Sequence, residues 1–202
     1  LVINNSRLAE YLYLFIAIPV FIEIEFILKI WLGEVPEFTA TFVRIVLFQS
    51  ALNPIDYPVG MLIHASGKMK WPSIITVVPL YSIFIIAYFL LESGYSPATV
   101  YVVSAILFTW KNIINMYFAR KYSGISIRSI LKESYMNVGI GGFVMFIIPY
   151  LISTVNFHTD WIKFGVVGFV SVMTSVIVVY CWGLSRMMRQ MVNTKFQAIF
   201  QK

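Results

Sequence analysis

Cysteine and histidine are scarce in this sequence, which contains one cysteine, Cys181, and two histidines, His64 and His158. A single cysteine excludes an internal disulfide and a cysteine-based metal cluster. The histidines lie far apart, and neither has a carboxylate at the spacing of metal ligands. A nucleophile elbow, a phosphate-binding loop and a dinucleotide fingerprint are also missing from the sequence. We therefore expect that the chain is not an enzyme and that it carries no cofactor or metal.

Charged residues are rare as well, at 12% of 202 residues, whereas 59% are hydrophobic and mean hydropathy is +0.82. This composition excludes a soluble domain of this size and predicts a helical membrane protein with several spans. The net charge of +6 is typical of cytoplasmic loops that contact anionic lipids. Because no loop shows a constellation of basic and aromatic residues typical of DNA or RNA binding, we expect no nucleic-acid partner.

The hydrophobic runs predict an all-α transmembrane bundle that forms one domain over residues 1–202. Each run is close to the roughly 20 residues that a bilayer requires. After the fourth run, apolar and charged residues alternate at helical spacing, which predicts an amphipathic helix at the membrane interface over about 125–136. The six predicted spans are about 12–32, 42–63, 73–91, 98–118, 138–155 and 162–184.

Basic residues predict the orientation of these spans. Eleven of the fifteen Lys and Arg lie before the first span, in every second loop and after the last span, which places both termini in the cytoplasm. The opposite side carries Lys163 and the acidic residues Glu34, Glu37, Glu92 and Asp160. The eleven residues are Arg7, Lys68, Lys70, Arg120, Lys121, Arg128, Lys132, Arg186, Arg189, Lys195 and Lys202.

The second predicted span contains more polar groups than lipid contact allows. Gln49, Asn53 and Asp56 follow one another at helical spacing, and Arg44 lies one turn or so before them. Polar groups in hydrocarbon are costly, so these side chains should face protein or water. We interpret this stripe as the wall of a water-lined path.

Two prolines, Pro54 and Pro58, interrupt the same span. Proline cannot donate a backbone hydrogen bond, and its ring displaces the carbonyl four residues earlier. The sequence therefore predicts a kinked helix in which some carbonyl groups are free.

The fourth predicted span carries a second polar stripe that includes Ser104, Lys111 and Asn115. Lys111 lies about eight residues from the cytoplasmic end of the span, on the order of 12 Å. Its ammonium group either extends along the helix to the lipid headgroups or faces a cavity, and the sequence leaves both interpretations open.

The first predicted span contains three charged residues. Glu25 and Lys29 are four residues apart in the favourable order, which predicts an ion pair between them. Glu23 has no such partner, so it must find one on another helix, be protonated, or line a cavity.

Four short segments resemble one known family in their order and spacing. They end the first span, end the second span, precede the fourth span and follow it. The resemblance extends from about Arg7 to Tyr135 and more loosely beyond. The segments are Lys29-Ile30-Trp31-Leu32-Gly33, Ala65-Ser66-Gly67-Lys68, Glu92-Ser93-Gly94-Tyr95-Ser96-Pro97-Ala98 and Ile125-Ser126-Ile127. In this order they resemble the C-terminal part of bacterial polysaccharide flippases of the O-antigen type, within the multidrug and oligosaccharidyl-lipid exporters.

The resemblance implies a transporter with two lobes around a central cavity in the bacterial inner membrane. Such flippases move an undecaprenyl-diphosphate-linked oligosaccharide outward by alternating access. The family has no strict catalytic signature, so the candidate residues follow from charge and position. We expect Arg44 and Lys111 to bind phosphate, with Gln49, Asn53 and Asn115 beside them in the cavity. Asp56 and Glu23 are candidates for ion coupling, and Asp56 alternatively pairs with Arg44.

The chain has about half the spans of this family, so one lobe is absent from it. We expect a piece of a longer protein, and otherwise two copies that face each other. Other functions stay open: a lobe of a multidrug or ion antiporter, or an assembly subunit of polysaccharide biosynthesis that transports nothing. A membrane polymerase would require a large outer loop, and the predicted outer loops are short. The expected partners are the lipid-linked oligosaccharide, anionic lipids, the second lobe and polysaccharide assembly proteins.

Overall fold

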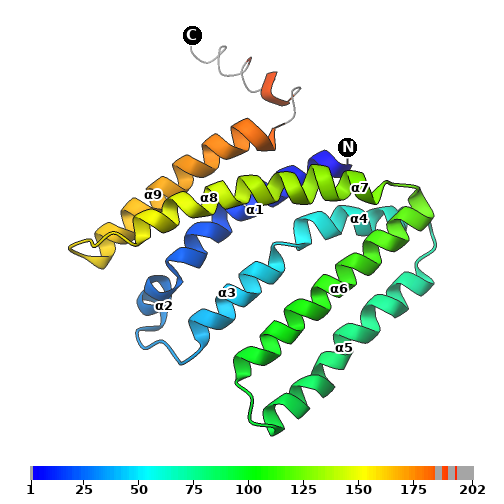
Figure 1. Cartoon of the computed structure of the whole chain (residues 1–202), viewed down its shortest axis with the longest axis horizontal. Helices are drawn as coiled ribbons and strands as arrows, with labels where there is room; N and C mark the ends of the chain where they lie inside the picture. Colours follow the sequence, from blue (N-terminus) through cyan, green and yellow to red (C-terminus); the bar gives the residue numbers. More distant parts are fainter. Residues whose placement is uncertain (1, 185–187, 191–193, 195–202) are drawn as a thin grey trace.

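The computed structural model describes residues 2–184, 188–190 and 194, and every regular element in these ranges is helical (Figure 1). Five helical segments within them are long and apolar enough to cross a membrane. These segments confirm the predicted all-α bundle and the multi-pass membrane protein. They are Asn5–Ile22 in α1 (Val2–Ile22), α5 (Lys70–Glu92), α6 (Pro97–Ser123), Ile127–Ser153 and Asp160–Gly183.

The last four predicted spans correspond to helices with similar bounds. The spans predicted at 73–91 and 98–118 match α5 and α6. The spans predicted at 138–155 and 162–184 match α8 (Asn137–Ser153) and α9 (Asp160–Val178), and α9 continues as the π-helix η2 (Val179–Gly183).

The second predicted span consists of two helices in succession, α3 (Thr39–Ser50) and α4 (Asn53–Ala65), with a turn between them. Pro54 stands immediately after this turn, and it cannot donate the hydrogen bond that would continue α3 into α4. The interruption predicted from the prolines is therefore present, and it lies two residues before the first of them.

The first predicted span, 12–32, has the wrong bounds. The membrane-length segment is Asn5–Ile22, and the chain bends at Glu23 before the short helix α2 (Ile24–Leu32). Glu25 and Lys29 are exposed on α2 and reach charged groups on other elements, so the bend removes two charges from the apolar helix.

The separate interfacial helix predicted at 125–136 is also wrong. α7 (Ile127–Ile130) and the π-helix η1 (Leu131–Met136) run without interruption into α8. Ile130 and Ser134 are buried inside the protein, at 2% and 0% exposed. Of the predicted apolar face, Ile130 is therefore covered by other helices, whereas Leu131 is 45% exposed.

The connections between helices alternate between two ends of the molecule (Figure 1). One end, the basic end, contains the N-terminus, the turn before α5 and the turn before α7, with Lys68, Lys70, Arg120, Lys121 and Arg128. The other, the acidic end, contains the connections around 33–38, 93–96 and 154–159, with Glu34, Glu37, Glu92 and Asp160. The cytoplasmic position of the basic end stays a prediction, and Arg186, Lys195 and Lys202 lie outside the described residues.

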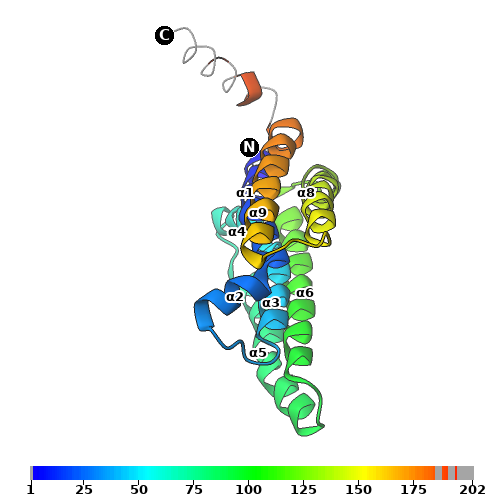
Figure 2. The ribbon, with the colours of Figure 1, turned by 90° about the vertical axis from the view of Figure 1, so that its left-hand side faces the viewer.

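The helices form two groups that share α1 as their border. α1, α8 and α9 pack on one another, while α3, α4 and α5 each pack on α6. Figure 2 shows the first group above α3, α5 and α6. Contacts of α1 with α4 and α3 join the groups. One apolar cluster lies in each group: Tyr11, Ile18, Val138, Met145 and Val178 in the first, and Ile55, Val59, Ile63, Phe118, Ala119 and Ile130 in the second.

Tyr11 fixes the approach of α1 to α8. Its ring is fully buried, and its hydroxyl donates to the Asn137 backbone carbonyl and side-chain Oδ1, at 3.0 Å each. A Cβ placed on Gly141 would overlap this ring, because it would lie 2.7 Å from Tyr11 Cε1. Gly141 is therefore the point at which α8 touches the Tyr11 ring.

We expect Gly141→Ala to lower the free energy of unfolding by about 1–3 kcal/mol, because the held Tyr11 ring cannot move aside. Gly139→Ala is the matched control, since nothing lies within 4 Å of a Cβ at that position. Reversible unfolding in mixed micelles measures both. Equal stability of the two variants would contradict this packing.

Candidate functional site

A buried ion pair joins α4 to α6. Lys111 Nζ donates to Asp56 Oδ2 at 2.7 Å, and Asn115 Nδ2 donates to Asp56 Oδ1 at 2.8 Å. Lys111 and Asn115 are one turn apart on α6, so both reach the same carboxylate. The Lys111 ammonium also lies 4.7 Å from the centre of the Phe108 ring. Asp56 is thus neutralised and bonded through both oxygens.

This pair lies well inside α4 and the membrane-length helix α6. Asp56 precedes the end of α4 by nine residues and Lys111 precedes the end of α6 by twelve, roughly 14 and 18 Å along the helix axes. The side chains are only 10% and 21% exposed. Burial of an unpaired charge at such a position costs several kcal/mol of free energy, and each residue of the pair offsets this cost for the other. In the structure the Lys111 ammonium group is turned toward Asp56 and the pocket between α4, α5 and α6, and not along α6 toward the helix end.

A polar pocket of about 280 Å³ lies beside the ion pair, between α4, α5 and α6. His64, at the end of α4, and Met69, just before α5, place one side of it near the basic end. The pocket therefore connects the membrane-embedded pair with the basic loops. Its lining comprises Asp56, Tyr57, Gly60, Met61, Ile63, His64, Met69, Pro72, Ser73, Thr76, Lys111 and Asn115.

The two predicted polar stripes face each other across α3, α4 and α6. Ser104 Oγ donates to Gln49 Oε1 at 3.5 Å. These residues precede Lys111 and Asp56 by seven positions each, about two helical turns. Asn53 is half-buried at the start of α4, between Gln49 and Asp56 in the chain. The structure thus brings together three of the predicted site residues, Asp56, Lys111 and Asn115. Gln49 contacts Ser104 of the second stripe instead, and Asn53 does not line the pocket.

Arg44 lies elsewhere, toward the acidic end. Its Nη2 donates to Glu25 Oε1 at 3.0 Å, and its Nε donates to the Phe21 carbonyl at 3.5 Å. The predicted pair of Arg44 with Asp56 is wrong, because Arg44 pairs with Glu25 and Asp56 pairs with Lys111. The predicted pair of Glu25 with Lys29 is wrong as well, since Lys29 Nζ lies 3.9 Å from Asp160 Oδ2 instead.

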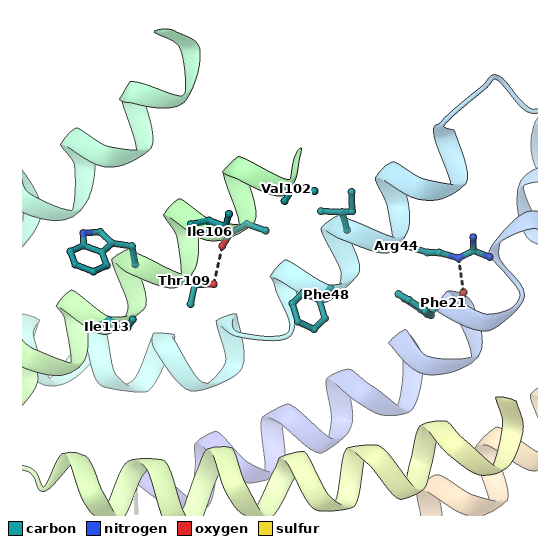
Figure 3. A pocket seen from close by; sticks show the side chains of 10 residues that line it. Phe21, Arg44, Phe48, Val102, Ile106, Thr109 and Ile113 are labelled. Atoms are coloured by element: carbon teal, nitrogen blue, oxygen red, sulfur yellow. Dashed lines mark hydrogen bonds between the residues drawn. The ribbon is translucent and has the colours of Figure 1, made fainter. Parts of the chain in front are cut away.

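An apolar pocket of about 590 Å³ extends from Arg44 along α3 and α6. Figure 3 shows Arg44 and Phe21 at one end of this pocket and Ile113 at the other. Arg44 is the only charged residue among those that line it, and the Thr109 hydroxyl is bonded to the Ala105 carbonyl of its own helix. This pocket suits a hydrocarbon or aromatic ligand better than a sugar.

Glu23 occupies the bend between α1 and α2. It is 5% exposed, and its Oε1 accepts no hydrogen bond from any described residue. A pocket of about 250 Å³ at the acidic end is lined by Glu23 together with Glu25, Lys29, Asp160 and Lys163. Glu23 is therefore separated from Asp56, and the two candidates for ion coupling do not share a site.

Sequence reasoning missed Glu10, which is 3% exposed on α1. The predicted first span began at residue 12, so Glu10 was outside it, whereas the membrane-length segment begins at Asn5. A hydropathy window moved a few residues toward the N-terminus would have included it.

No protein-family model, curated protein or solved structure matches the chain. Within the part of the chain that the structure describes, no group of three or more His, Cys, Asp and Glu is arranged to hold a metal ion. The interpretation of the site therefore depends on its own geometry and on the sequence resemblance.

We expect the single variant Lys111→Met to be less stable than the double variant Asp56→Asn/Lys111→Met. The single variant leaves Asp56 charged and unpaired, which costs about 3–5 kcal/mol, whereas the double variant buries no charge. A double-mutant cycle of unfolding free energies measures the coupling. Additive effects of the two substitutions would contradict a buried pair.

Proposed function

We propose that the chain is one lobe of a transporter that flips undecaprenyl-diphosphate-linked oligosaccharide across the bacterial inner membrane by alternating access. The Lys111–Asp56 pair beside the polar pocket supports this proposal most directly, because it holds a cation at membrane depth within reach of a polar space. Ammonium groups are common ligands of phosphate. The order of the sequence motifs supports the same family.

In this proposal Lys111 exchanges one anionic partner for another. Without substrate, Asp56 neutralises the ammonium group, so the lobe does not bury an isolated charge. A diphosphate that enters the pocket offers Lys111 stronger and more numerous acceptor oxygens. Asp56 then keeps its bond to Asn115 and is exposed to the pocket, where water or a coupling ion can bind it.

The basic end would face the cytoplasm, where the lipid-linked substrate is made and where anionic lipids attract basic loops. Both termini would lie on this side. A complete central cavity requires a second lobe, supplied by the rest of a longer protein or by a second copy with the same orientation. Polysaccharide assembly proteins are further partners in this proposal.

A second candidate is an assembly subunit that transports nothing. The contacts of Gln49 with Ser104 and of Asp56 with Lys111 and Asn115 favour it, because polar groups that satisfy each other also serve packing alone. A third candidate, a lobe of a multidrug antiporter, is favoured by the aromatic lining of the apolar pocket, with Phe21, Phe48 and Trp110.

We expect Asp56→Asn/Lys111→Met to reduce surface glycan by roughly tenfold or more in cells that depend on this flippase. The double variant keeps a neutral, packed interior but removes the cation, and a charge-assisted bond contributes about 1.5–3 kcal/mol. Quantitative glycan blots and the amount of protein in the membrane are measured together.

Lys121→Met is the matched control, because Lys121 is an exposed cation at the end of the same helix. Lys111→Arg should retain part of the export, since it keeps the positive charge. Normal surface glycan from the double variant, at normal protein level, would refute the flippase proposal and favour the assembly subunit.

A further inference from the structure

α1 carries a buried carboxyl group that the proposed export site does not use. Glu10 is 3% exposed, lies within the membrane-length segment Asn5–Ile22, and has a buried Oε2 that accepts no hydrogen bond from any described residue. Arg7, three residues earlier, forms no ion pair with it among the described residues, and its own Nε is buried without a partner. An ionised carboxylate in this setting lacks both solvent and counter-ion.

Tyr135 lies close to both α1 and α4. It packs against the apolar cluster that contains Ile55 and Val59 of α4. Tyr135 belongs to η1, which packs against α1. Single π-helical turns inside α-helices occur frequently at functional sites, and Ser134 in the same turn is fully buried with its Oγ unbonded.

Few other titratable groups surround Glu10. Between its ends α8 carries no Asp, Glu, His, Lys or Arg, and the charged residues of α9, Asp160 and Lys163, lie at the acidic end. Lys132 and Glu133 of η1 are exposed, and on the neighbouring turn η2 the titratable side chains are Tyr180 and Cys181. The helices α2, α3 and α4 also pack on α1, and their charged or titratable residues are Glu25, Lys29, Arg44, Asp56, Tyr57 and His64. On α1 itself Arg7, Tyr11 and Tyr13 lie within one turn of Glu10, and Tyr135 belongs to η1.

We infer that Glu10 is a proton-binding site, whose carboxylate takes up one proton from the water of the basic end and is neutral in the conformation seen here. Burial without a counter-ion favours the protonated acid over the carboxylate. Proton release requires a cation or an acceptor to come within reach. Proton binding by Glu10 does not rest on the proposed export function.

Infrared difference spectroscopy tests the site directly. We expect the chain in lipid vesicles to show a carbonyl stretch of a protonated carboxylic acid that disappears as pH is raised. Glu23 is also buried with an unbonded carboxyl oxygen, so the test uses a Glu23→Gln background. In this background Glu10→Gln should lose the band, whereas Glu133→Gln, which removes an exposed carboxylate from η1, should keep it.

A band that persists unchanged in Glu10→Gln, or a wild-type spectrum without any such band, would overturn the inference. If Glu10→Gln does not insert stably, Glu10→Asp decides in its place: a shifted band supports the inference, and an unshifted band overturns it. Because no export is measured, failure of the proton site and failure of the flippase proposal give different results.

Discussion

The ion pair of Asp56 with Lys111 is the constraint on which the second helix group depends. Each charge is mostly buried in protein, and desolvation costs several kcal/mol per ion unless an opposite charge is in contact. The pair therefore fixes both the distance between α4 and α6 and their register, and Asn115 satisfies the remaining carboxylate oxygen. The polar pocket follows from the same arrangement, because α5 packs on α6 and covers the pair from the other side.

Interruptions of helices place the remaining charges. The turn before Pro54 separates α4 from α3, and Asp56 on α4 faces α6. The bend at Glu23 places Glu25 and Lys29 on α2, where Glu25 pairs with Arg44 and Lys29 with Asp160. The π-helical turn η1 packs on α1 and carries Ser134, which is fully buried. In each case an irregular backbone coincides with polar side chains, as expected where regular helix would leave them in lipid.

Composition and hydrophobic runs were enough to predict the all-α membrane bundle, because a bilayer dictates helix length and apolar character. Polar residues at helical spacing likewise predicted that Asp56 on α4 and Lys111 on α6 face protein or a polar space. The sequence did not predict which charged residues form ion pairs. Lys29 lies four residues after Glu25, yet Glu25 pairs with Arg44 because the chain bends at Glu23. The apolar face of 125–136 was predicted to touch lipid, since sequence alone does not distinguish lipid from protein as the apolar neighbour. Glu10 was missed for a related reason, as its polar neighbours placed it outside the predicted span.

The account depends most on the claim that water reaches the Lys111 pocket from the basic end. Thr76→Cys and Val77→Cys, each in a Cys181→Ser background, lie at the same depth of α5, one lining the pocket and the other exposed on the outer face. A membrane-impermeant thiol reagent applied from the basic side should label position 76 and leave position 77 unlabelled. If neither position reacts, the polar groups are closed against each other, and the lobe packs helices rather than moving a substrate.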